Sequence, residues 1–118
     1  MKSVLLVDDS LMMRKMLRNI LTKNGYDIVG EAENGEEAVE KYKELRPDAV
    51  TMDFVMDKMN GLDALRNIIS INPGANVIMV SSMGQEVIVR DAIVLGAKNF
   101  LLKPFNEQQV VEALEKLQ

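Results

Sequence analysis

The chain has 118 residues, 47% of them hydrophobic and 27% charged, a composition typical of one globular domain with its own core and not of a disordered or fibrous protein. It contains no cysteine and no histidine, which excludes thiol catalysis, disulfides, cysteine-ligated metals and a phosphohistidine carried by this chain. Its 14 basic and 18 acidic residues give a formal net charge of −4, and without a basic tract no direct binding to nucleic acid is expected.

The first apolar segment, Val4–Val7, is too short for the core of a signal peptide and far too short for a transmembrane helix. We therefore expect a cytoplasmic protein that does not bind a membrane. Because the sequence shows no linker, repeat or low-complexity segment, residues 1–118 are expected to form a single domain.

Short apolar segments alternate along the chain with longer segments of helical periodicity. The short segments are predicted to be strands, in chain order Val4–Val7, Asp27–Ala32, Ala49–Met52, Val77–Val80 and Phe100–Leu102. Several of them are apolar throughout and rich in branched residues, which is typical of strands buried on both faces of a parallel sheet.

The five longer segments are predicted to be helices, one after each strand. The first four end at a helix breaker: Gly25, Pro47, Pro73 and Gly96. The second and the fifth begin with the spacing of a capping box, Asn34 with Glu37 and Asn106 with Gln109. Five strand–helix units in strict alternation predict a doubly wound (βα)5 domain of the α/β class, because parallel strands need crossover helices on both faces of the sheet.

Polar residues follow four of the five predicted strands. Asp8 and Asp9 follow the first strand, Asp53 the third, Ser81 the fourth and Lys103 the fifth. Ligands of such sheets bind at the carboxyl ends of the strands. Crowded carboxylates repel each other by about 4 kcal/mol per pair at about 4 Å, and a hard divalent cation such as Mg²⁺ offsets that repulsion. A single aspartate there is explained equally well as a helix cap or turn former, whereas the full set favours a cation site.

Five motifs resemble, in order and spacing, those of response-regulator receiver domains. They are Val7-Asp8-Asp9-Ser10, Thr51-Met52-Asp53, Met59-Asn60-Gly61, Val80-Ser81-Ser82 and the segment from Gly96 to Phe105. The resemblance covers Val4 to Leu117 and implies a flavodoxin-like fold. Within the family, the first helix and the stretch Ser81 to Gln85 most resemble the stand-alone chemotaxis regulators of the CheY type.

The resemblance implies a two-component phosphorylation switch. Asp53 would accept a phosphoryl group from a phosphohistidine of a sensor histidine kinase. Asp9, Asp53 and the backbone carbonyl of Val55 would bind Mg²⁺ directly, and Asp8 would act largely through water. The chain would then be no enzyme toward other substrates, catalysing only its own phosphorylation and dephosphorylation.

Three further residues acquire roles from the same resemblance. Lys103 would pair with a phosphoryl oxygen, and the Lys103-Pro104 bond is typically cis in receivers, although Pro104 is also explained as a break before the last helix. Ser81 would hydrogen-bond the phosphoryl group, and Phe100 stands at the position of the aromatic switch residue. Plain core packing explains Phe100 equally well.

The fourth helical segment is apolar nearly all round, so part of it must be buried in the core or in an interface. By angular position, Val87 and Val94 are expected to face outward, toward an output partner. The resemblance places output on the face formed by the fourth helix, fifth strand and fifth helix, with the flagellar switch as the expected partner and a phosphatase as an additional one. An apolar but unused surface helix is the alternative.

The loop after Asp53 departs from the family. Receivers usually have Met-Pro there, whereas this chain has Met56-Asp57. Val55 and Met83 flank the site with apolar side chains, which offer no acid or amide to orient a hydrolytic water. Slow self-dephosphorylation is therefore predicted.

Other functions remain to be weighed against the switch. A Mg²⁺-dependent phosphohydrolase with an aspartyl nucleophile usually has a tight Asp-x-Asp and a longer chain. A phosphorylation-independent interaction module, or the receiver domain of a larger regulator, also fits the sequence. A nucleotide-binding module is not supported, because no glycine-rich phosphate loop is present.

Overall fold

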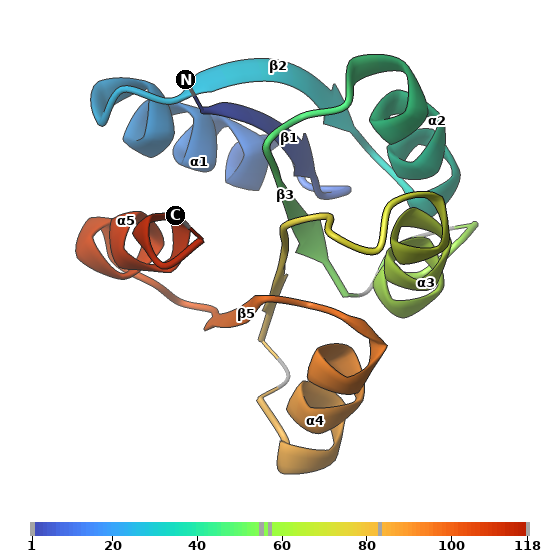
Figure 1. The fold of residues 1–118 in the computed structure, drawn as a ribbon. Helices are drawn as coiled ribbons and strands as arrows, with labels where there is room; N and C mark the ends of the chain where they lie inside the picture. Colours follow the sequence, from blue (N-terminus) through green and yellow to red (C-terminus); the bar gives the residue numbers. More distant parts are fainter. Residues whose placement is uncertain (1, 55, 57, 83, 118) are drawn as a thin grey trace.

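Strands and helices alternate along the chain in the computed structural model, which describes residues 2–54, 56, 58–82 and 84–117 (Figure 1). The strands are β1 (Ser3–Val7), β2 (Asp27–Ala32), β3 (Ala49–Asp53), β4 (Val77–Ser81) and β5 (Asn99–Leu102). The helices are α1 (Leu11–Lys23), α2 (Gly35–Leu45), α3 (Gly61–Ile71), α4 (Glu86–Leu95) and α5 (Glu107–Glu115). The predicted α/β alternation is confirmed.

The strands form one parallel sheet in the order β2-β1-β3-β4-β5. The chain moves outward from β1 to β2 on one side and from β3 to β5 on the other, so the direction of winding reverses between β1 and β3. A doubly wound sheet opens a crevice at the carboxyl ends of the strands where this reversal occurs. Residues 8 and 9, which follow β1, and Asp53, at the end of β3, therefore meet at this point.

Helices cover both faces of the sheet (Figure 1). Helices α1 and α5 pack on one face, and α2, α3 and α4 pack on the other. Side chains of β1 alternate between the two faces of the sheet. Val4 and Leu6 belong to the core beneath α1 and α5, and Leu5 and Val7 belong to the core beneath α2, α3 and α4. Each such buried side chain contributes about 1.5–3 kcal/mol through removal of apolar surface from water.

The starts of the helices follow the sequence signals with one exception. At α5 both halves of the capping box are present, because Asn106 and Gln109 each accept a hydrogen bond from the other's backbone N–H. At α2 the side chain of Asn34 accepts from the Glu37 N–H as predicted. The reciprocal bond was predicted wrongly, since the Glu37 carboxylate accepts from the N–H of Glu33, one residue before the cap.

Four strands are one residue longer than the apolar pattern indicated: β1 and β5 begin one residue earlier, and β3 and β4 end one residue later. Asp53 is the last residue of β3 and Ser81 the last residue of β4, so both functional candidates are held by the sheet and do not begin a loop. Because Asp53 pairs with Val80 across the sheet, their backbones support each other at the edge of the crevice. Within the described part of the chain, no helix combines the length and apolarity needed to cross a membrane.

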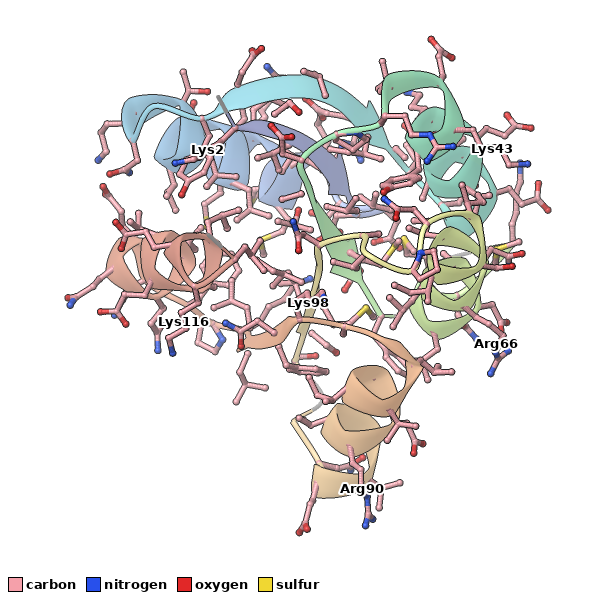
Figure 2. The ribbon with its side chains drawn as sticks, in the orientation of Figure 1. Lys2, Lys43, Arg66, Arg90, Lys98 and Lys116 are labelled. Atoms are coloured by element: carbon pink, nitrogen blue, oxygen red, sulfur yellow. The ribbon has the colours of Figure 1, made fainter. Side chains whose placement is uncertain are left out.

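The basic side chains labelled in Figure 2 lie at well-separated places in this view of the molecule. The labelled ones come from both ends of the chain and from the elements between them: Lys2, Lys43, Arg66, Arg90, Lys98 and Lys116.

Candidate functional site

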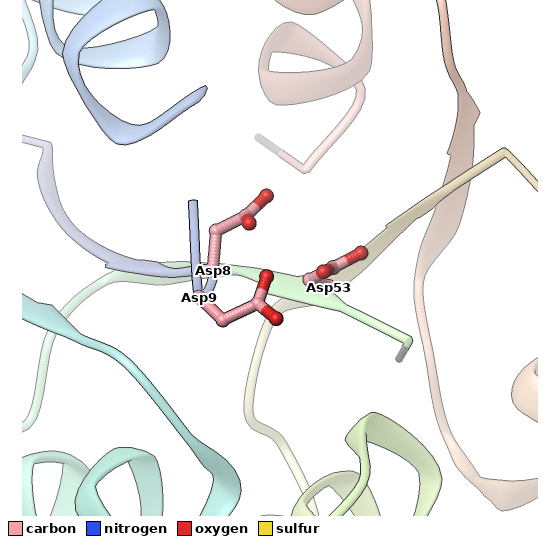
Figure 3. A group of neighbouring side chains, drawn as sticks. All are labelled: Asp8, Asp9 and Asp53. Carbon is pink, nitrogen blue, oxygen red and sulfur yellow. The ribbon is translucent and has the colours of Figure 1, made fainter. Parts of the chain in front are cut away.

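Three aspartates meet at the carboxyl edge of the sheet (Figure 3). Asp8 and Asp9 follow β1 and Asp53 ends β3, and one carboxylate oxygen from each lies within 4.8 Å of the others. Asp8 and Asp53 are buried, with 2% and 7% of their surface exposed, while Asp9 is exposed. The cluster therefore has two carboxylates held in the protein and a third facing solvent.

Lys103 reaches this cluster from the end of β5. Its Nζ lies 3.2 Å from Asp8 Oδ2 and 3.3 Å from Asp53 Oδ1. Its backbone N–H donates to the Ser81 carbonyl at 2.8 Å, which ties the ends of β4 and β5 together. The Lys103-Pro104 peptide bond is cis, as the resemblance implied.

The pKa values within the cluster reflect its crowding. Burial, followed by the negative charge of Asp8, raises the pKa of Asp53 from an ordinary 3.8 to about 6, although Lys103 opposes the shift. Burial by itself lowers the pKa of Lys103, but the charges of Asp53 and Asp8 outweigh it, so that this pKa is raised. Asp53 is thus mostly ionised at neutral pH and lies beside a firmly charged ammonium.

The donor set fits Mg²⁺. Three carboxylates and one ammonium carry a net formal charge of −2, which one divalent cation neutralises. All the side-chain donors are hard oxygen atoms, and one of the three aspartates is open to solvent, which suits an ion that retains several waters. The Val55 carbonyl, which the resemblance adds to the ligands, lies outside the described residues, as do Asp57 and Met83.

The two switch candidates lie on neighbouring strands. Ser81 is buried at the end of β4 and pairs with Leu102 of β5. Phe100, two residues before Leu102, is half-buried and packs against the core cluster beneath α2, α3 and α4. The structure thus places Ser81 at the acidic edge and Phe100 farther from it.

Helix α4 leaves much of its apolar surface uncovered. Val87 and Val94 are 56% and 78% exposed, which agrees with the orientation expected from the helical pattern. Ile93 is also exposed, and Leu102 of β5 adds a fourth uncovered apolar side chain. Among the residues of α4, only Ala92 is fully buried.

One buried charged residue beside the cluster was missed by the sequence reasoning. Arg14 of α1 donates from Nη1 to the Asp8 carbonyl at 2.6 Å and from Nε to Glu31 Oε1 at 2.7 Å. A signal was available, because Arg14 lies in helical register with Leu17 and Leu21, the other buried residues of α1. A charge on the apolar face of a helix needs a buried partner.

Comparisons with known proteins identify the family to which this arrangement belongs. The family model described as "Response regulator receiver domain" matches residues 4–115. The chain is 57% identical over 116 residues to the chemotaxis protein CheY of Thermotoga maritima, covering 98% of this chain and 97% of that protein. It is 53% identical over 113 residues to CheY of Bacillus subtilis, covering 96% and 94%.

A solved structure supports the same family assignment. The crystal structure of a CheX-CheY-BeF3-Mg²⁺ complex from Borrelia burgdorferi matches with a TM-score of 0.96 at 41% identity, covering 98% of this chain and 88% of that one. The fold is therefore the flavodoxin-like CheY fold. CheY-type receivers are signalling proteins of two-component systems and not enzymes with separate substrates. The chain belongs to the response-regulator receiver domain family and is closely related to the CheY chemotaxis regulators.

Proposed function

We propose that residues 1–118 form one receiver domain that is switched when Asp53 takes a phosphoryl group from a phosphohistidine of a sensor histidine kinase. The observation that supports this proposal is the clustering of Asp8, Asp9 and Asp53 oxygens within 4.8 Å, with the Lys103 ammonium beside two of the three. Phosphoryl transfer depends on positioning and charge neutralisation more than on a protein base, and this cluster supplies both.

In the transfer step, a carboxylate oxygen of Asp53 attacks the phosphorus. An O–P bond forms as the P–N bond to the donor imidazole breaks, and the electron pair returns to the imidazole nitrogen. Lys103, held beside Asp53, pairs with a phosphoryl oxygen and stabilises its charge. The histidine belongs to the donor, which is how a chain without histidine takes part in this chemistry.

Mg²⁺ is the proposed cofactor. Asp9, Asp53 and the Val55 carbonyl would hold it directly, and Asp8 would hold it largely through water. When bound, the ion supplies charge neutralisation for the phosphoryl oxygens. Without it, the repulsion between the aspartates and an incoming phosphoryl group would be offset by Lys103 alone.

The switch itself is proposed as a shift between two populations. In the phosphorylated state, Ser81 is drawn to the phosphoryl group and Phe100 turns inward. Strands β4 and β5 pair directly, with Met79 beside Phe100 and Ser81 beside Leu102, so a movement at the site has a short route to the aromatic ring. Couplings of this kind are about 1–3 kcal/mol.

The output is proposed to be binding of the flagellar switch to the face formed by α4, β5 and α5, in the cytoplasm. The uncovered side chains of Val87, Val94 and Leu102 support this choice, because exposed apolar patches commonly mark protein interfaces. A CheX-like protein is a second partner, since the Borrelia CheY structure contains CheX.

The phosphorylation proposal is tested by intact mass after incubation with acetyl phosphate, with and without Mg²⁺. Wild type should gain one phosphoryl group only with Mg²⁺, and Asp53→Asn should gain none. Asp27→Asn is the matched control, because Asp27 is an exposed aspartate at the opposite edge of the sheet, at the start of β2, and should react as wild type does.

Other outcomes of this experiment point elsewhere. No addition under any condition would contradict the switch and leave the phosphorylation-independent module. Continuous hydrolysis of a generic phosphate ester by wild type would indicate the phosphohydrolase instead.

The output proposal is tested by binding of the phosphorylated chain to a flagellar switch protein from the same organism. Val87→Ser and Val94→Ser should weaken binding, while the control Leu11→Ser, which removes an apolar side chain of similar exposure from α1, should not. Equal loss in all three variants would exclude a specific role for α4.

A further inference from the structure

Arg14 contacts the acidic cluster through the backbone of Asp8. Only 7% of the surface of this arginine is exposed. Its Nη1 donates to the Asp8 carbonyl at 2.6 Å, and its Nε donates to Glu31 Oε1 at 2.7 Å. One planar guanidinium therefore joins α1, the end of β1 and the end of β2 with a fixed geometry that a flexible ammonium does not provide.

The polar groups of Asp8 are held from four directions. Its N–H donates to the Ala32 carbonyl at 3.0 Å, its Oδ1 accepts from the Ser10 N–H at 2.8 Å, and its Oδ2 lies 3.2 Å from Lys103 Nζ. Arg14 supplies a donor to the remaining group, the carbonyl. Removal of Arg14 would leave this buried carbonyl without its donor, which is unfavourable, so the peptide should rotate or recruit water.

The Asp8 carbonyl belongs to the peptide that connects Asp8 to Asp9, and its orientation sets the direction in which the Asp9 side chain leaves the backbone. We propose that Arg14 is a positioning residue of the cation site, which fixes the Asp8–Asp9 peptide so that the three carboxylates converge. This inference rests on the Mg²⁺ binding proposed above and adds to it a residue that contacts neither the metal nor the phosphoryl group.

The proposed role is geometric and not electrostatic. The Arg14 guanidinium is paired with two carboxylates, Glu31 Oε1 at 2.7 Å and Glu33 Oε1 at 3.8 Å, so much of its charge is neutralised locally. What charge remains would repel a divalent cation. The two explanations therefore differ in sign: removal of a charge alone would tighten Mg²⁺ binding, whereas loss of the positioning hydrogen bond would weaken it.

Arg18 offers a matched control. It donates from Nε and Nη2 to Glu31 Oε2 at 2.9 and 2.6 Å, so it shares the same carboxylate as Arg14. Among the hydrogen bonds of the described residues, the bond to the Asp8 carbonyl is made by Arg14 and not by Arg18. Arg18→Met removes the same charge from the same partner and leaves the Asp8 carbonyl bonded.

The test is calorimetric titration of Mg²⁺ into the unphosphorylated full chain, with folding checked by circular dichroism. Arg14→Met should weaken Mg²⁺ binding by roughly tenfold or more, as is usual when a residue that orients a metal ligand is removed. Arg18→Met should stay within about twofold of wild type. Arg14→Lys keeps the net charge, so a loss of Mg²⁺ affinity in this variant would arise from the changed geometry and not from the charge.

A second measurement needs no metal. The hydrogen bond to the Asp8 carbonyl polarises the peptide whose nitrogen belongs to Asp9, so the amide ¹⁵N resonance of Asp9 should shift in Arg14→Met and Arg14→Lys but not in Arg18→Met. If Arg14→Met does not fold, Arg14→Lys tests the positioning role by itself, through both its Mg²⁺ affinity and the Asp9 resonance.

The outcomes separate this inference from the proposed function. Wild type that binds Mg²⁺, with Arg14 variants that bind it equally or more tightly, would overturn the positioning role alone. Wild type that binds no Mg²⁺ would overturn both the role and the cofactor.

Discussion

The ammonium of Lys103 lies 3.3 Å from Asp53 Oδ1, although the two residues are 50 positions apart in the chain. The same ammonium lies 3.2 Å from Asp8 Oδ2. Lys103 thus balances part of the negative charge of the cluster before any phosphoryl group or divalent cation arrives. It is therefore placed to substitute in part for a cation in the resting state and, in the proposed function, to pair with the phosphoryl group after transfer.

Lys103→Met should separate these two effects. Because Lys103 lowers the pKa of Asp53, its removal should raise that pKa above about 6. Mg²⁺ affinity should increase, since a competing positive charge is gone, while the rate of phosphorylation by acetyl phosphate should fall by roughly 10²–10³. Titration calorimetry and intact mass would measure the two, with the exposed Lys98→Met as control. Loss of Mg²⁺ affinity would contradict the assignment.

The raised pKa of Asp53 predicts a pH-dependent cost to folding in the absence of metal. The folded protein binds the Asp53 proton up to about pH 6, whereas the unfolded chain releases it near 3.8. The contribution of Asp53 to the free energy of unfolding therefore falls as pH rises from about 4 to 6, and it stays low above that range.

Asp53→Asn should remove this cost. Its free energy of unfolding should exceed that of wild type by about 1–2 kcal/mol at pH 7.5, after allowance for solvent screening, and by much less at about pH 4. Urea unfolding in EDTA at both pH values would measure it. A difference independent of pH would show that burial of the Asp53 charge is not its origin.

Gly61 lies against the backbone of Asp53, the proposed phosphoacceptor. A Cβ at this position would lie 2.2 Å from the Asp53 carbonyl oxygen, and the Gly61 N–H donates to the Phe54 carbonyl at 2.8 Å. Gly61→Ala should therefore destabilise the protein by roughly 1–3 kcal/mol and slow phosphorylation. Gly74→Ala is the control, because its Cβ would meet only an ordinary contact at 3.5 Å, and thermal unfolding of the two should differ clearly.

Thr51 is a buried polar residue in the middle of β3. Its Oγ1 has no hydrogen-bond partner among the described residues. Thr51→Val replaces the hydroxyl by a methyl group of similar shape, so the free energy of unfolding should rise by about 1 kcal/mol. Denaturant unfolding would test this, with the exposed Thr22→Val expected to change stability by less than about 0.5 kcal/mol. Destabilisation would indicate that a water or a further group satisfies the hydroxyl.

The persistence of the phosphoryl group is predicted from sequence alone. Val55→Asn and Met83→Glu would each place an amide or acid where wild type has an apolar side chain, and either group could orient a hydrolytic water. Both should shorten the lifetime of phosphorylated Asp53, followed by phosphate release after removal of the donor. Unchanged lifetimes in both variants would exclude this explanation of slow dephosphorylation.

Most of the fold was predictable, because the signals for it are local. Alternating apolar and amphipathic segments specify strand and helix by period, and parallel pairing then requires crossovers. The ends of elements were less predictable. Asp53 and Ser81 were placed just after their strands because polarity interrupts the apolar pattern, but the backbone ladder continues through both residues.

Residue patterns were enough to predict the α/β class, the positions of the aspartates and Lys103 at strand ends, and the outward orientation of Val87 and Val94. Which side chains contact one another depends on tertiary packing. Arg14 contacts the Asp8 carbonyl and Glu31 contacts two arginines because α1 packs over β1 and β2, which pair side by side in the sheet, and residue spacing does not encode this packing. The raised pKa of Asp53 is likewise a tertiary property, because burial and neighbouring charge depend on packing and not on residue type.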